Sequence, residues 1–243
     1  MLGFFQISYD KVNVDLTQGE FNMDKYNIIL FDLDGTLSDP KVGITKSVQY
    51  ALQKMNIIES DINKLECFIG PPLQDSFTEY YNFDEENTQK AIDFYRERFK
   101  EIGMFENELY SNISLLLKSL KDLNFTLVVA TSKPTVFAEQ ILVHFNIDQY
   151  FDLVVGSNLD GTRTAKTEII KYIIDMYNDH SLAEFIMIGD KKHDIIGANN
   201  NSIDSIGVTY GYGPYEELSF SNPTYIVKCV DQLIDILVRT QVK

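Results

Sequence analysis

Cysteine is scarce in this chain of 243 residues, which contains only Cys67 and Cys229. They are too few for a disulfide framework, and their separation in sequence indicates no metal-binding motif. Long apolar runs are missing as well. None approaches the roughly 18 residues of a membrane span, and the first residues lack the basic start and apolar stretch of a signal peptide. These absences exclude a disulfide-stapled or membrane-spanning protein and predict a soluble protein in the reducing cytoplasm.

Basic residues are also in the minority. The chain has 21 lysines and arginines against 36 aspartates and glutamates, which gives a net charge of -15. An acidic surface gains nothing from the anionic backbone of a nucleic acid or from an anionic membrane. We therefore expect neither as a general partner, whereas a small anion needs only a local positive site. The sequence predicts no particular oligomeric state.

Internal repeats and low-complexity tracts are absent, and a chain of this length accommodates one core domain with a smaller insertion. Short apolar runs instead alternate with helical patterns. The runs predict strands at residues 28–30, 125–130, 153–156, 185–188 and 205–208, and the helical spacing predicts helices at residues 113–120, 136–145, 167–177 and 193–199. This alternation predicts the α/β fold class with a parallel sheet.

After Asp39 the pattern changes to helical for roughly seventy residues. Apolar residues recur at a spacing of three to four between residues 44 and 55 and again between residues 91 and 99, which predicts two amphipathic helices. The glycine and paired prolines of residues 68–73 lie between these helices. They predict a rigid loop, and such a loop can position a ligand.

Two carboxylates, Asp32 and Asp34, follow directly after the apolar run at residues 28–30. Ligands of open α/β sheets bind outside the carboxyl ends of the strands, so we expect both side chains to lie in an active site. In isolation the pattern is also that of a polar turn, because Asp and Gly favour turns. A calcium loop is disfavoured, since the third Asp and the later Glu of that motif are missing at the required spacing.

The segment from Asp32 to Asp39 matches the first motif, Asp-x-Asp-Gly-Thr-x-x-Asp, of the haloacid dehalogenase superfamily phosphatases. Three further motifs follow in the superfamily's order. Residues 131–134 resemble the second, Lys166 the third and residues 189–194 the fourth. Each motif alone has an ordinary structural explanation, but four in order make coincidence improbable.

The resemblance spans residues 27–239 and implies a Rossmann-like parallel sheet core with an inserted α-helical cap domain. The core is expected at residues 27–39 and 112–243, and the cap at residues 40–111. We expect the cap to move about hinges near both junctions. Residues 1–26 have mixed polarity and precede the first predicted strand, so they are expected to form an N-terminal appendage.

The resemblance also implies catalytic roles. Asp32 would be the nucleophile, which divides a difficult displacement into formation and hydrolysis of an aspartyl-phosphate. Asp34 would act as general acid and then as general base. Dehalogenases of the superfamily lack a carboxylate at this place, so Asp34 favours phosphoryl transfer. Thr131 would donate its hydroxyl to the phosphoryl group, and Lys166 would neutralise nucleophile and phosphate.

Carboxylates around a phosphate require a cation, because two unit charges about 4 Å apart repel by about 4 kcal/mol at an effective dielectric near 20. Oxygen ligands and a phosphate substrate favour Mg²⁺. The resemblance implies that Asp32, Asp190 and the backbone carbonyl of Asp34 are its ligands. Asp194 would contact the water shell of the metal.

The expected partner is a small phosphorylated metabolite. Six residues are predicted to contact it, namely Gly35, Thr36, Gly70, Pro71, Ser132 and Arg163. The closest resemblance is to the phosphoglycolate phosphatase and 5′-nucleotidase-like branch, and residues 68–73, 156–164 and 207–213 resemble its nucleotidase-like members. We therefore expect nucleoside 5′-monophosphates as substrates, with phosphoglycolate or another small ester as the alternative.

Two further alternatives stay open. A sugar-phosphate mutase also uses an aspartyl-phosphate and a helical cap, but such mutases commonly carry a bulkier aliphatic residue at the position of Thr36. A non-catalytic phosphate-binding module is disfavoured by the intact carboxylates.

Overall fold

The computed structural model describes residues 15–16 and 25–239 of the chain. Its central sheet contains β1 (Asp15–Leu16), β2 (Ile28–Phe31), β5 (Thr126–Pro134), β6 (Leu153–Ser157), β7 (Phe185–Gly189), β8 (Asp204–Val208) and β9 (Tyr225–Val227). The strand order is β1-β9-β8-β7-β2-β5-β6. Neighbouring strands are parallel from β9 to β6, and β1 pairs antiparallel with β9.

The central strands are buried on both faces. In β2, Ile28 and Leu30 pack into one apolar cluster, whereas Ile29 and Phe31 pack into the other. Successive side chains of a strand point to opposite faces, so a strand covered by helices on both sides must be apolar throughout. This requirement explains the continuous apolar runs in the sequence.

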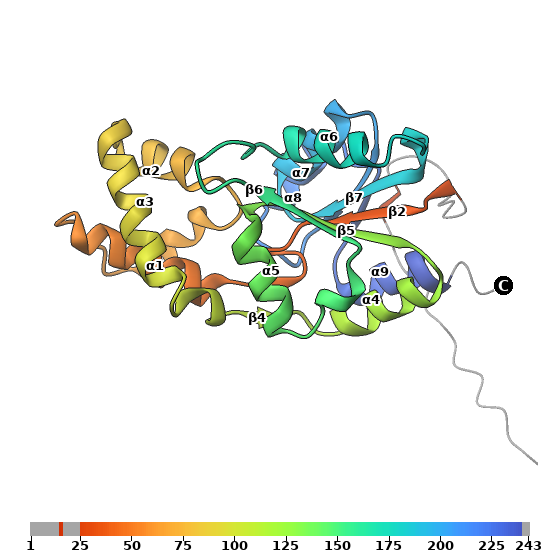
Figure 1. The fold of residues 1–243 in the computed structure, drawn as a ribbon, viewed down its shortest axis with the longest axis horizontal. Helices are drawn as coiled ribbons and strands as arrows, with labels where there is room; N and C mark the ends of the chain where they lie inside the picture. Colours follow the sequence, from red (N-terminus) through yellow and green to blue (C-terminus); the bar gives the residue numbers. More distant parts are fainter. Residues whose placement is uncertain (1–14, 17–24, 240–243) are drawn as a thin grey trace, which may run out of the picture.

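Helices cover both faces of the sheet (Figure 1). They are α4 (Ile113–Asp122), α5 (Thr135–His144), α6 (Lys166–Met176), α7 (Lys192–Asn200), α8 (Tyr215–Phe220) and α9 (Val230–Ile234), and the π-helical turn Asp235–Arg239 continues α9. The buried residues of α6 and α7 share a cluster on one face, and those of α4, α5 and α9 share a cluster on the other. The predicted α/β class with a parallel sheet core is confirmed.

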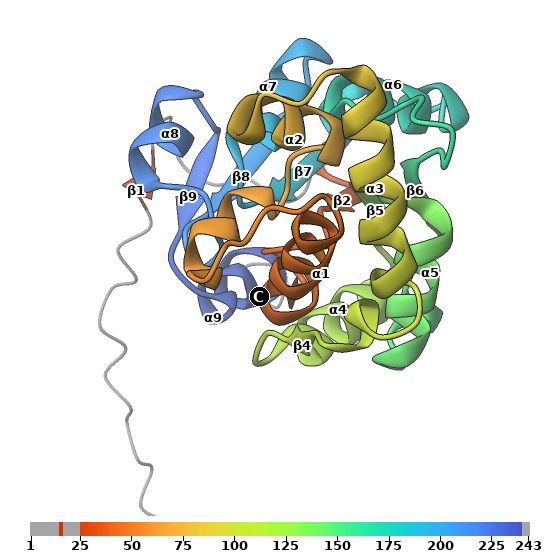
Figure 2. The same cartoon turned by 90° about the vertical axis from the view of Figure 1, so that its left-hand side faces the viewer.

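A group of helices lies at one end of the molecule, on the left of Figure 1 and facing the viewer in Figure 2. It consists of α1 (Lys41–Lys54), α2 (Leu73–Tyr81), α3 (Glu85–Phe99) and the 3-10 turns Ile62–Phe68 and Gly103–Phe105. The short antiparallel strands β3 (Ser38–Asp39) and β4 (Glu108–Leu109) connect it to the sheet, so both predicted hinges lie side by side. The group occupies the place of the predicted cap, whose boundaries and motion stay predictions.

The sheet extends beyond the boundary predicted at its N-terminal side. Asp15 and Leu16 form β1 against Ile226 and Tyr225 of β9, and Tyr26 is buried. An exposed sheet edge offers unpaired backbone groups to any extended segment, and two residues are too few to show a strand periodicity in sequence. Part of the predicted appendage therefore belongs to the sheet, and most of residues 1–24 lie outside the described residues. Within the described ranges no helix combines the length and apolar composition needed to cross a bilayer.

Candidate active site

The ends of three adjacent strands bring the predicted motifs together. Asp32 follows β2, Thr131 lies in the last part of β5, and Asp190 follows β7, while β2 pairs with both β5 and β7. All three strands are parallel, so their carboxyl ends meet at one edge of the sheet. The backbone N–H of Asp32 donates to the carbonyl of Ile188 at 2.9 Å and holds the first carboxylate beside β7.

The turn after β2 is specified by Gly35. Its φ is +86°, a conformation that residues with a side chain rarely adopt, and a Cβ there would lie 2.3 Å from Oδ2 of Asp190. Its N–H donates to the carbonyl of Ser38 at 2.8 Å. Thr36 is fully buried, and its carbonyl accepts a hydrogen bond from the Tyr210 hydroxyl at 2.9 Å. Gly35 and Thr36 thus shape the turn that carries Asp34.

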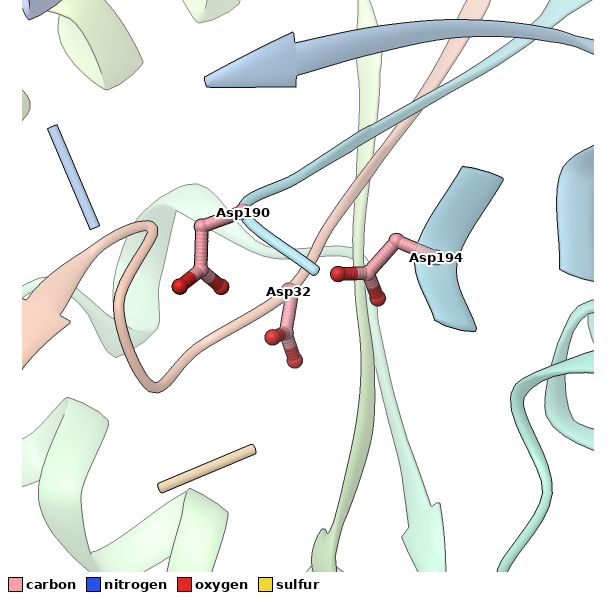
Figure 3. A group of neighbouring side chains, drawn as sticks. All are labelled: Asp32, Asp190 and Asp194. Carbon is pink, nitrogen blue, oxygen red and sulfur yellow. The ribbon is translucent and has the colours of Figure 1, made fainter. Parts of the chain in front are cut away.

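Three buried carboxylates converge at this edge (Figure 3). Asp32, Asp190 and Asp194 each offer an oxygen atom, and these oxygens lie within 4.8 Å of one another. Burial, together with the charges of Asp32 and Asp194, raises the pKa of Asp190 to about 8. Burial also raises the pKa of Asp194 to about 6, although Lys166 opposes this shift. The cluster therefore binds protons more readily than free carboxylates do, because negative charges close together are disfavoured where water cannot screen them.

This donor set fits a metal cation. Oδ2 of Asp190 accepts a hydrogen bond from the backbone N–H of Tyr212 at 2.7 Å, whereas Oδ1 of Asp190 is buried with no hydrogen-bond partner among the described residues. A buried carboxylate oxygen without a partner is costly, and a divalent cation would satisfy it while offsetting the mutual repulsion of the three carboxylates.

Lys166, the first residue of α6, is the cation within the cluster. Its buried Nζ lies 2.7 Å from Oδ1 of Asp32 and 2.5 Å from Oδ1 of Asp194, and it donates to the carbonyl of Ala130 at 2.8 Å. Burial acts to lower the pKa of Lys166, but the two carboxylates outweigh it and the pKa is raised. The ammonium group is therefore charged and fixes the orientation of Asp32.

Asp34 is paired with a second lysine. Its Oδ2 lies 2.9 Å from Nζ of Lys133, and both side chains are almost completely buried. Burial raises the pKa of Asp34, and Lys133 acts in the opposite direction. The ammonium of Lys133 also lies 4.4 Å from the ring centroid of Phe99 in α3. The pairing of Lys133 with Asp34 was not predicted, although the position of Lys133 in the second motif placed it near the site.

The loop after β8 is a further part of the site that the motifs alone did not identify. Besides the backbone bond to Asp190, Tyr212 donates its hydroxyl to Oδ1 of Asp39 in β3. Gly211 passes so close that a Cβ would lie 2.3 Å from the carbonyl oxygen of Gly35 and 2.5 Å from Cβ of Asp190. The glycines of this loop could have indicated its role in the site, because a glycine commonly marks a place where the backbone approaches another group closely.

Gly211→Ala should therefore disturb the site. We expect the free energy of unfolding to fall by about 1–3 kcal/mol, because the added methyl must displace buried backbone or Asp190, and turnover should fall with it. The control is Gly207→Ala, whose Cβ would meet its nearest neighbour, Leu218, at an ordinary 3.5 Å. Urea unfolding and steady-state rates measure both variants, and equal behaviour of the two would contradict this account of the loop.

A cavity of about 190 Å³ opens beside the carboxylates, between the helical group and the sheet edge. Asp34, Ser132 and Lys133 line it from the core, and Gly70 and Pro71 line it from the loop before α2. Four aromatic side chains add to its walls, namely Phe68, Tyr95, Phe99 and Phe137. The cavity is thus continuous with the general acid predicted from the first motif.

Arg163 lies elsewhere. Its Nε donates to the carbonyl of Gly156 at 3.0 Å, its Nη2 donates to Oδ1 of Asn158 at 3.3 Å, and its guanidinium lies 4.5 Å from the ring centroid of Tyr172. It is not among the residues that line the cavity. The backbone at Arg163 is left-handed, with φ 52°, a conformation that no residue pattern there had indicated. The predicted substrate contact of Arg163 is therefore not seen in this arrangement.

Comparison with known proteins agrees with the geometry. Residues 29–208 match the family model described as haloacid dehalogenase-like hydrolase. A 5′-nucleotidase of Pseudomonas aeruginosa is 48% identical over 208 residues, which cover 85% of this chain and 92% of that protein. A phosphoglycolate phosphatase of Colwellia psychrerythraea is 28% identical over 224 residues, or 89% of this chain and 97% of that protein.

Among solved structures, a predicted phosphatase from Clostridium acetobutylicum superposes with a TM-score of 0.85 at 54% identity, covering 88% of this chain and 99% of that one. The match to the family model covers most of the chain, and the three relatives described above are a 5′-nucleotidase and two phosphatases by name. The chain therefore belongs to the haloacid dehalogenase-like hydrolases, and within that family it is a phosphatase.

Proposed function

We propose that this phosphatase hydrolyses nucleoside 5′-monophosphates through an aspartyl-phosphate on Asp32, with Mg²⁺ as cofactor. The observation that carries the proposal is the buried cluster of Asp32, Asp190 and Asp194, in which Lys166 pairs with Asp32 and Asp194, next to the cavity that Asp34 lines. A buried nucleophile, a fixed cation and a separate acid facing a cavity are the groups that phosphate ester hydrolysis requires.

Each residue has a defined step. A carboxylate oxygen of Asp32 attacks phosphorus while the ester P–O bond breaks, and Asp34 gives its proton to the departing oxygen. Water then attacks the same phosphorus, Asp34 takes the proton, and Asp32 is released with inorganic phosphate. Asp32, Asp190 and the backbone carbonyl of Asp34 would hold Mg²⁺, which when bound neutralises phosphate charge. Lys166 keeps Asp32 in position throughout.

The lining of the cavity favours a nucleoside as leaving group. Four of its lining residues are aromatic, and such apolar walls suit a planar base. The cationic side chains in the lining are Lys133 and Arg96, and Lys133 is already paired with Asp34. Asp75 and Asp160 add negative charge. A carboxylate next to the phosphate, as in phosphoglycolate, would therefore meet little net attraction, and the 48% identical 5′-nucleotidase supports the same choice.

A substrate panel tests this proposal. Nucleoside 5′-monophosphates, phosphoglycolate and sugar phosphates are compared by phosphate release in the presence of Mg²⁺. We expect kcat/KM to be at least about tenfold higher for the nucleotides, the ratio that 1.4 kcal/mol of differential binding gives. Equal rates for all esters would remove the nucleotide assignment but leave the phosphatase, and an isomer formed without phosphate would indicate a mutase.

Removal of the metal should abolish turnover. In EDTA we expect loss of phosphate release, because the repulsion among three buried carboxylates and the phosphate is then opposed only by lysines. Added Mg²⁺ should restore the rate. Binding of Mg²⁺ should also raise the melting temperature of wild type more than that of Asp190→Asn. A full rate in EDTA, or the same thermal shift in both proteins, would contradict the metal site.

A further inference from the structure

A side chain of the helical group is bonded to the core across the cavity. Arg96 of α3 donates from Nη1 to the carbonyl of Leu159 at 3.0 Å. Both residues line the cavity. Leu159 belongs to the loop of residues 157–164, which begins at the last residue of β6, leads toward α6 and extends toward the helical group in Figure 1. The contact therefore lies at the wall of the cavity, at a place that the catalytic carboxylates do not occupy.

The loop is held in shape by its own hydrogen bonds. The N–H of Asn158 donates to the carbonyl of Thr162 at 2.9 Å, and its side-chain amide donates to Oγ1 of Thr162 at 2.8 Å. Asp160 accepts from the N–H of Thr162 at 2.9 Å. The bonds of Arg163 to Gly156 and Asn158 fix the base of the loop. The carbonyl of Leu159 is thus presented to Arg96 by a preorganised turn.

The two cations of the cavity contact different groups, since Lys133 pairs with Asp34 whereas Arg96 bonds to the carbonyl of Leu159. Phe99 contacts Lys133, which pairs with Asp34, and Arg96 lies about one helical turn earlier in α3. A guanidinium has several N–H donors in a planar fork, and the bond to Leu159 uses one of them. The remaining donors suit oxygen or nitrogen acceptors of a leaving group long enough to reach them.

We propose that Arg96 and the loop of residues 157–164 form a specificity clamp for the distal part of the leaving group, with Arg163 as the residue that positions the loop. The inference rests on the proposed function, because it names the residues that make the site prefer a nucleoside. A small ester fills only the floor of the cavity near Asp34 and gains nothing from the clamp. A nucleoside reaches it, and that remote binding energy favours its turnover.

The clamp is tested by selectivity rather than by activity alone. Arg96→Ala and Arg96→Lys are compared with Lys90→Ala, an exposed position of the same helix that pairs with Glu86. For Arg96→Ala we expect kcat/KM for adenosine 5′-monophosphate to fall by about tenfold or more, the size of a lost charged hydrogen bond. Arg96→Lys keeps the charge but loses the planar fork of donors, so its kcat/KM for adenosine 5′-monophosphate should fall as well. Rates with phosphoglycolate should change by less than about twofold, and Lys90→Ala should match wild type with both esters.

Calorimetry with adenosine and with inorganic phosphate, both in the presence of Mg²⁺, measures whether Arg96 contributes to binding of the nucleoside or of the phosphate. Arg96→Ala should weaken adenosine binding and leave phosphate binding unchanged, and Arg163→Lys should do the same to a smaller extent. If Arg96→Ala lowers kcat/KM equally for adenosine 5′-monophosphate and phosphoglycolate, or leaves adenosine binding unchanged, the clamp is overturned while the nucleotide preference of wild type still stands. If wild type shows no nucleotide preference, the proposed function itself fails and the clamp fails with it.

Discussion

We expect Asp32→Asn to lose phosphate release by about 10⁴-fold or more, the scale of an effect from removing a covalent nucleophile. The amide has nearly the same shape but cannot attack phosphorus. The folded state should survive, because the substitution removes one of three mutually repelling buried carboxylates and leaves Lys166 paired with Asp194. Rates are measured in single-turnover reactions at saturating substrate, and folding is followed by thermal melting.

The matched control is Asp122→Asn in α4, an exposed aspartate whose partner is Lys118 on the same helix. A surface pair of this kind contributes at most about 1 kcal/mol, so its loss should leave turnover unchanged. A rate for Asp32→Asn within about tenfold of wild type would show that another group attacks phosphorus.

Lys166→Met has the second largest expected effect, because it acts on stability and on turnover together. Breaking a buried ion pair by removing one partner leaves uncompensated charge, and we expect the free energy of unfolding to fall by about 3–5 kcal/mol. The carboxylates of Asp32 and Asp194 lose their shared ammonium, so the nucleophile is no longer held. Urea unfolding measures the first effect, and the rate under conditions where the variant is folded measures the second.

A comparison with Lys171→Met separates these effects from the general loss of a lysine. Lys171 lies in the same helix, is exposed, and pairs with Asp175. We expect Lys171→Met to change neither the free energy of unfolding nor the turnover rate by much, because an exposed ion pair contributes little. If both variants unfold at the same denaturant concentration and turn over equally fast, the buried ammonium has no special role.

The core of the fold was readable from the sequence because each central strand must be apolar on both faces. The runs predicted at residues 28–30, 153–156 and 185–188 became β2, β6 and β7 with changes of one residue at an end. The carboxylates could be placed for the same reason, since parallel strands end at a common edge. Asp32 and Asp190 meet there although most of the chain lies between them.

Contacts that depend on how distant segments pack were not readable. The pairing of Lys133 with Asp34 needs both side chains to be buried together, whereas a lysine near a turn is usually exposed. The bond from Tyr212 to Asp39 joins residues that are 173 positions apart. The substrate contact predicted for Arg163 stays a prediction, and its bonds to the loop were not readable because they depend on a left-handed backbone and on the ring of Tyr172.

The most direct test of the central claim is a crystal structure of the protein grown with Mg²⁺ and beryllium fluoride, which mimics a phosphoryl group on a carboxylate. We predict an adduct on the side chain of Asp32, with Mg²⁺ bound by Asp32, Asp190 and the backbone carbonyl of Asp34. An Asp32 without the adduct at saturating beryllium fluoride, or an adduct on another carboxylate, would contradict the account.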